Sequence, residues 1–104
     1  MKLAIVGEET VAVVFRPFGV KTFPVGVPDE TRGVWRELDP AEFAVIFVTE
    51  PVYEVLREEI ELLRQQALPV ISVIPPMAGG RNLALEELSA MVERAVGTDV
   101  LLRE

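Results

Sequence analysis

Phe43-Ala44-Val45-Ile46-Phe47-Val48-Thr49-Glu50-Pro51 is the stretch that decides the fold. Its first six residues are continuously apolar, which is typical of a strand covered on both faces of a parallel sheet. Thr49 is a candidate cap for a helix that follows, and Pro51 would lie in the first turn of that helix. A buried strand followed at once by a helix indicates an α/β fold if the alternation recurs along the chain.

Three further apolar runs predict the other strands of the sheet, at residues 3–6, 20–23 and 70–74. The run at 3–6 is continuously apolar, as a central strand is. The run at 20–23 contains Lys21 and is followed by Pro24, which is typical of an edge strand.

Helical stripes separate these strands, because apolar side chains recur there at spacings of three and four residues. The stripes are Val11, Val14, Phe15 and Phe18; Thr31, Val34, Trp35 and Leu38; and Val52, Val55, Leu56, Ile60 and Leu63. Right-handed crossovers then predict a four-stranded parallel sheet of order 2-1-3-4 with helices on both faces, a receiver-like or Rossmann-like α/β fold.

The sequence changes in character after the fourth strand. Residues 75–81 contain two prolines and two glycines and read as a linker. Asn82 can cap a last helix over residues 83–96, and Gly97 suits the position just after its end. We therefore expect a sheet domain at 1–76, and a linker with a mobile C-terminal helix at 77–104.

The last helix carries an apolar stripe made of Leu85, Leu88, Met91, Val92 and Ala95. The stripe would suit a helix that folds back on the sheet. On a helix that a linker separates from a complete sheet, it also suits a partner protein. We take these residues as the candidate partner-binding site.

Composition excludes several classes of function. The chain has 104 residues, a net charge of −7, no Cys and no His. The charge argues against a nucleic-acid surface, and the missing residue types remove disulfides, the usual zinc ligands and the usual general base. No apolar run approaches the roughly 20 residues that span a bilayer, and the N-terminal run is too short for a signal peptide. We expect a cytoplasmic protein without direct membrane insertion.

Acidic residues are the main candidates for chemistry. Glu8 and Glu9 follow the first strand and Glu50 follows the third, so all three lie at the carboxyl edge of the predicted sheet. A phosphoryl receiver domain has an acidic pair there, but it also needs an aspartate after the third strand and a lysine after a fifth. Those residues are missing here. We expect helix N-terminal carboxylates rather than a divalent-cation site, and no catalytic residue, metal or cofactor.

Two other features read as structural. Gly79-Gly80-Arg81 lacks the strand-to-helix context of a phosphate loop and reads as part of the linker. Trp35 is expected to be a half-buried packing residue, although a binding role would also suit it.

Four segments, in order along nearly the whole chain, resemble the F subunit of the archaeal and vacuolar-type rotary ATPases. They are Phe15-Arg16-Pro17-Phe18-Gly19-Val20, the stretch 43–50, the stretch 68–75 with its Ile74-Pro75 end, and Val96-Gly97-Thr98-Asp99-Val100. The first segment departs from the family's usual Gly-Phe-Arg-Leu-Ala-Gly-Ile. Val14 replaces its leading glycine, and Pro17-Phe18 replaces Leu-Ala.

The resemblance implies a non-catalytic subunit of the central stalk, the rotor of an ion-translocating ATPase. It implies binding to the coiled-coil D subunit and, through it, to the catalytic A/B head. It also implies that the C-terminal helix tunes ATP hydrolysis or synthesis, in a complex that holds the chain at the membrane periphery. The alternatives are a receiver-like regulatory domain without phosphorylation chemistry and a small nucleotide- or ligand-binding α/β domain.

Overall fold

The computed structural model describes residues 2–75, 86–87, 90 and 94. Strands and helices alternate through the first of these ranges. They are β1 (Lys2–Gly7), α1 (Glu9–Phe15), β2 (Lys21–Pro24), α2 (Thr31–Glu37), β3 (Phe43–Thr49), α3 (Glu50–Leu63) and β4 (Val70–Ile74). Short 3-10 turns precede or follow the helices at Arg16–Phe18, Pro28–Glu30 and Pro40–Glu42. The fold class predicted from the sequence is confirmed.

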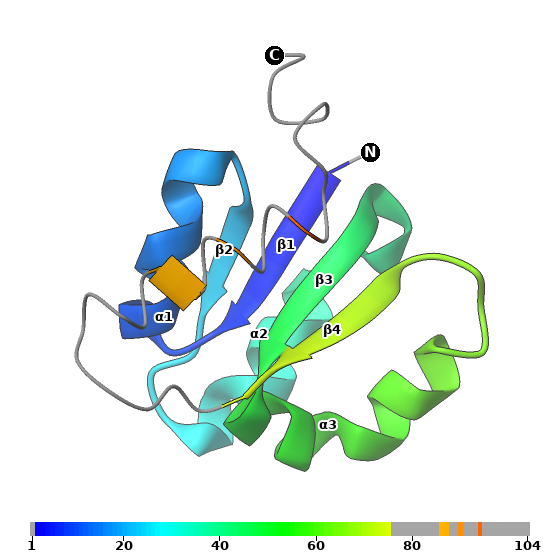
Figure 1. Cartoon of the computed structure of the whole chain (residues 1–104). Coiled ribbons are helices and arrows are strands. Elements are labelled where there is room, and N and C mark those ends of the chain that lie inside the picture. The colour runs from blue at the N-terminus through cyan, green and yellow to red at the C-terminus, as the bar shows by residue number, and fades with distance from the viewer. Residues whose placement is uncertain (1, 76–85, 88–89, 91–93, 95–104) are drawn as a thin grey trace.

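The sheet has four strands in the order β2-β1-β3-β4, and each neighbouring pair is parallel (Figure 1). The two continuously apolar runs of the sequence are the central strands β1 and β3. The run containing Lys21 forms the edge strand β2, as predicted. The predicted order 2-1-3-4 is therefore confirmed.

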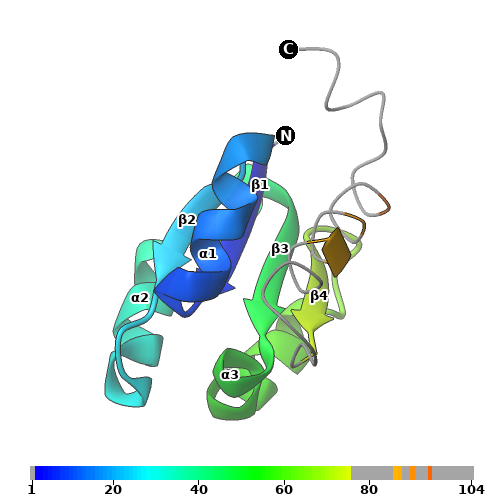
Figure 2. The ribbon, with the colours of Figure 1, turned by 60° about the vertical axis from the view of Figure 1, so that its left-hand side comes forward.

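The helices lie on both faces of the sheet, with α1 on one face and α2 and α3 on the other (Figures 1 and 2). Side chains alternate between these faces along each strand. Ile5 and Phe47 pack with Phe15 of α1, and the rings of Phe15 and Phe47 are 5.1 Å apart between centroids. Val6 and Ile46 pack instead in the cluster under α3.

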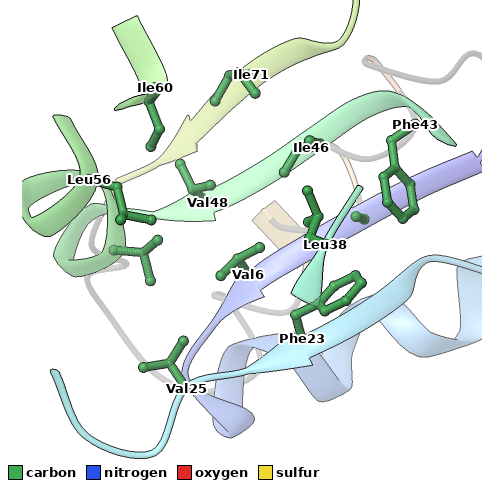
Figure 3. Packing of buried hydrophobic residues seen from close by; sticks show 12 residues of the cluster. Val6, Phe23, Val25, Leu38, Phe43, Ile46, Val48, Leu56, Ile60 and Ile71 are labelled. Atoms are coloured by element: carbon green, nitrogen blue, oxygen red, sulfur yellow. The ribbon is translucent and has the colours of Figure 1, made fainter. Parts of the chain in front are cut away.

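The larger core lies on the face of the sheet that α2 and α3 cover (Figure 3). Val52, Leu56 and Ile60, one turn apart along α3, are almost completely buried there. A register shift between Lys2 and Leu3, opposite the start of β3, brings Phe43 into the same cluster as Ile46. Strict alternation would have put Phe43 on the α1 face, so this irregularity decides which core the ring fills.

Two details of the predicted helices are wrong. The α-helix of the first stripe ends at Phe15, and Phe18 lies in the 3-10 turn that follows. Pro17 has no N–H and its ring clashes with the preceding turn, so the α-helix cannot continue through it. Thr49 precedes α3 as predicted, but its side chain makes no cap hydrogen bond to that helix.

The predicted linker beyond Pro75 and the five residues of the candidate partner-binding stripe lie outside the described residues. Four positions within the predicted helix 83–96 are described. Glu86, Glu87, Ala90 and Arg94 are all helical and exposed. Their spacing places them on one side of a helix, away from the apolar stripe that the sequence predicts.

Candidate functional site

The carboxyl edge of the sheet brings the end of β1 next to the end of β3. Val6 and Val48 are register partners, so Gly7 and Thr49, which follow them as the last residues of β1 and β3, are neighbours. The Thr49 hydroxyl donates a hydrogen bond of 3.0 Å to Oε1 of Glu8. Thr49 is a buried polar residue, and this bond satisfies its hydroxyl at the place where the two crossovers begin.

Gly7 lets the two strand ends approach this closely. A Cβ atom at this position would lie 2.4 Å from Cγ2 of Thr49 and 3.0 Å from its Oγ1. Any side chain at Gly7 would therefore push Thr49 away from Glu8. The residues Gly7, Glu8 and Thr49 form one closely packed unit.

The remaining acidic residues at this edge do not converge. Glu9 lies in the first turn of α1 and pairs with Arg16 at 2.7 Å, and Glu50 lies exposed in the first turn of α3. Both positions are those of helix N-terminal carboxylates, as predicted. Within 2–75 and the four helical positions beyond, no three His, Cys, Asp or Glu side chains are grouped so that they could hold a metal ion.

The end of β3 also determines what this edge can do chemically. The chain there reads Val48-Thr49-Glu50, and the buried Thr49 stands at the strand end where a receiver domain has its phosphorylated aspartate. Its hydroxyl is engaged with a carboxylate and has no histidine or lysine beside it in the sequence. This arrangement fixes the geometry of two crossovers and offers no nucleophile of the receiver type.

The outer face of α3 carries an ordered cluster around Tyr53. The guanidinium carbons of Arg57 and Arg64 lie 5.3 and 5.7 Å from the centre of the Tyr53 ring. The Tyr53 hydroxyl donates a hydrogen bond of 2.9 Å to Glu61, and Arg64 pairs with the same carboxylate at 2.8 Å. The hydrogen bond to Glu61 is the main reason that the pKa of Tyr53 is raised above 10.0. Cation–π contacts hold this ring in place on the surface.

Exposed apolar side chains mark other parts of the described surface. The large ones are Val13, Val27, Leu62, Leu68 and Val70. Leu62 and Val70 flank the connection from α3 to β4, and Leu68 lies within it. Leu62 is the most exposed of the five at 65%. Trp35, in contrast, is partly buried against the α3-side core, which confirms the packing role predicted for it.

Sequence reasoning missed two surface residues that organise their surroundings, Tyr53 and Arg32. For Tyr53 a signal exists, because Arg57, Glu61 and Arg64 follow it at spacings that keep them on one side of a helix. Arg32 contacts α3 from α2, and no spacing in the sequence indicates such a long-range contact. Among the described helices none is long and apolar enough to cross a membrane.

Comparison with known proteins places these features in a family. Residues 3–92 match the model of the ATP synthase (F/14-kDa) subunit family. The chain is 36% identical over 100 residues to the F subunit of the V-type ATP synthase of Clostridium perfringens, covering 96% of this chain and 95% of that protein. It is 33% identical over 101 residues to the F subunit of the A-type ATP synthase of Methanothermobacter thermautotrophicus, covering 95% of each.

The match extends over both parts of the sequence. It includes almost the whole α/β unit and most of the predicted last helix, and the similar proteins are F subunits of V-type and A-type ATP synthases. The chain therefore belongs to the ATP synthase (F/14-kDa) subunit family, whose members are accessory rather than catalytic subunits of a rotary ATPase.

Proposed function

We propose that this chain is a rotor subunit of the central stalk of a V- or A-type ATPase and that it binds the coiled-coil D subunit. Through the D subunit it would act on the catalytic A/B head and modulate the coupling of ATP hydrolysis or synthesis to ion transport. The observation that carries the proposal is the family match over residues 3–92, which relates the chain to the F subunits of such complexes. Binding to the D subunit is the part of this proposal that the experiment below tests.

The packing of the α/β unit supports separate roles for the first and the last part of the chain. Residues 2–75 hold two hydrophobic clusters, one on each face of the sheet, and the largest side chains of both are fully buried. We propose that 1–76 is the folded body and that 77–104 provides a linker and a mobile helix. The stripe of the candidate partner-binding site, Leu85, Leu88, Met91, Val92 and Ala95, would then meet the coiled coil.

The four described positions of that helix agree with this orientation. Glu86, Glu87, Ala90 and Arg94 are exposed, as expected for the side of a docking helix that faces solvent. An apolar stripe with charged residues opposite is the pattern by which a helix engages the groove or seam of a partner. We propose a cytoplasmic location, peripheral to the membrane through the ATPase complex.

A pair of charge variants on opposite sides of the helix tests the contact. Leu88→Glu puts a carboxylate in the stripe, whereas Ala90→Glu adds the same charge at an exposed helical position. Each variant is produced with the D subunit from the same organism, and complex formation is measured by size-exclusion chromatography and calorimetry. We expect Leu88→Glu to weaken binding by roughly tenfold or more, because a buried unpaired carboxylate is costly. Ala90→Glu should bind as the unaltered chain does.

Thermal unfolding of the isolated variants separates binding from folding. If residues 77–104 are independent of the sheet domain, both variants should melt close to the unaltered chain. An isolated Leu88→Glu chain that is unfolded would mean that the helix is part of the core, and the detachable helix would then be wrong. Equal binding by all three proteins would show that the stripe does not contact the coiled-coil partner.

A further inference from the structure

Helix α3 is bent near its middle. Leu56 has φ −106° and ψ 18°, outside the helical region, although the helix runs from Glu50 to Leu63. Bends of this kind have identifiable causes, such as proline, glycine or a side chain inserted into the backbone hydrogen bonds. The segment contains no glycine, and its one proline, Pro51, precedes the bend, whereas proline disturbs the turn before itself. Neither a glycine nor a proline within α3 therefore accounts for the bend.

A side chain from α2 contacts the bend directly. Nη2 of Arg32 donates a hydrogen bond of 3.0 Å to the carbonyl oxygen of Val55, the peptide immediately before Leu56. Nη1 of the same guanidinium pairs with the carboxylate of Glu59. In an uninterrupted helix the Val55 carbonyl accepts the amide of Glu59. Arg32 therefore contacts both residues of one helical hydrogen-bond pair.

We propose that Arg32 is the latch that holds α3 in its bent form and joins α2 and α3 into one rigid unit. The guanidinium suits this role because its fork presents several donors in a fixed plane and so reaches a carbonyl and a carboxylate together. A lysine ammonium lacks that fixed fork and could not present two donors in the same geometry.

Core packing does not require the bend. Val52, Leu56 and Ile60 are buried and follow one another at intervals of four residues, the spacing by which a straight helix presents one face to a sheet. Leu56 itself is completely buried, so the bend occurs at a well-packed residue and not at a loosely held one.

The bend also positions the surface cluster around Tyr53. Tyr53 precedes the bend, whereas Arg57, Glu61 and Arg64, which contact it, follow it. Straightening α3 would change the direction from Tyr53 to these partners. Arg32 is thus a positioning residue for a surface that it does not itself touch.

Nuclear magnetic resonance can test the latch with a matched pair of variants. Arg32→Met keeps an unbranched apolar stem and removes the donors. Arg36→Met makes the same change at an exposed arginine one turn along α2, which makes no hydrogen bond or ion pair with the described residues. The readouts are the Cα chemical shift of Leu56, which reports backbone conformation, and hydrogen exchange of the amides from Leu56 to Ile60.

In Arg32→Met we expect the Leu56 Cα shift to move toward helical values. We expect exchange of those amides to change by roughly three- to tenfold, the effect of one or two net hydrogen bonds. Amides of β1 and β3 should keep their protection, which shows that the domain remains folded. Arg36→Met should leave both readouts as they are.

Glu59→Gln separates the two halves of the latch, because it removes the ion pair and leaves the donor to Val55. If Arg32 holds the bend through the carbonyl, this variant should keep the non-helical shift of Leu56. The proposal is overturned if Leu56 stays non-helical in a folded Arg32→Met, or if Arg36→Met produces the same changes.

Discussion

At the scale of single residues, the close packing at Gly7 decides the form of the carboxyl edge. A hydrogen atom at this position leaves room for Thr49, and Thr49 in turn reaches Glu8 at 3.0 Å. From the sequence, Thr49 looked like a helix cap and Glu8 like half of an acidic pair. Only the adjacency of β1 and β3 shows that they bond to each other, and a pattern read along one strand carries no such information.

Gly7→Ala should destabilise the domain by about 1–3 kcal/mol, the usual cost of overpacking a filled site. The added Cβ would lie 2.4 Å from the Thr49 methyl carbon, so the strand end or the threonine must move. Urea unfolding followed by the fluorescence of the one Trp measures the change. Gly33→Ala is the control, because a Cβ there meets nothing within 4 Å. Because position 33 lies in the interior of α2, alanine there should stabilise the domain slightly. Equal effects of the two changes would contradict the packing described here.

Tyr53 offers a spectroscopic test at the same scale, since it is the one tyrosine of the chain. The pKa of its hydroxyl is raised above 10.0, first by the hydrogen bond to Glu61. Tyrosinate absorbance during an alkaline titration should therefore show ionisation at a higher pH in the folded protein than in urea. Glu61→Ala should bring the folded value back toward the ordinary pKa, whereas Glu58→Ala should not.

The raised pKa of Tyr53 makes the stability of the fold depend on pH. Because the folded pKa lies above the unfolded one, the hydrogen bond stabilises the fold fully below pH 10.0. That contribution is lost as the pH rises through the folded pKa. An identical Tyr53 titration in the unaltered protein and in Glu61→Ala would mean that the hydrogen bond does not form in solution.

At the scale of elements, the continuous apolar runs predicted the strands well because a strand buried on both faces has no polar positions. That signal correctly identified β1 and β3 as central, and Lys21 with Pro24 correctly identified β2 as an edge. The bend in α3 could not be predicted, since its sequence has neither proline nor glycine at the bend and the contacting Arg32 lies 23 residues away from Val55. Nothing in the sequence indicates the register irregularity at the start of β3 either, although it determines which core Phe43 packs in.

Ile46 tests the assignment of β3 as the centre of the sheet. Its side chain is completely buried in the α3-side core. Ile46→Ala should lower the free energy of unfolding by about 2–5 kcal/mol, through lost apolar burial and the cavity left behind. Leu62→Ala is the control, because Leu62 is 65% exposed and its truncation should cost within about 0.5 kcal/mol. A loss below roughly 1 kcal/mol for Ile46→Ala would contradict the core described here.

At the scale of the whole molecule, the α/β unit resembles a receiver domain in topology, but its chemistry differs. Thr49 stands at the end of β3 and no third carboxylate joins Glu8 and Glu9 among the described residues. Incubation with acetyl phosphate and Mg²⁺ should therefore leave the intact mass unchanged. A stoichiometric, chemically labile phosphate adduct would favour a signalling protein over an accessory ATPase component.

The candidate partner-binding stripe was predicted from periodicity, and periodicity alone leaves open what covers it. Leu85, Leu88, Met91, Val92 and Ala95 lie outside the described residues, and the exposed positions Glu86, Glu87, Ala90 and Arg94 agree with the predicted helix. A binding face is defined by two molecules, so one sequence can indicate an apolar stripe and not its occupant.

Membership of the rotor is tested most directly by affinity purification of the tagged chain from membranes of the organism that encodes it. Mild detergent extraction, followed by native mass spectrometry, measures which proteins accompany the chain and in what ratio. We predict one copy of this chain with one copy of the coiled-coil D subunit, together with the catalytic A and B subunits. ATPase activity should reside in the complex and not in the isolated chain. Recovery of the chain free of every ATPase component, from cells that contain the assembled enzyme, would contradict a place in the rotor.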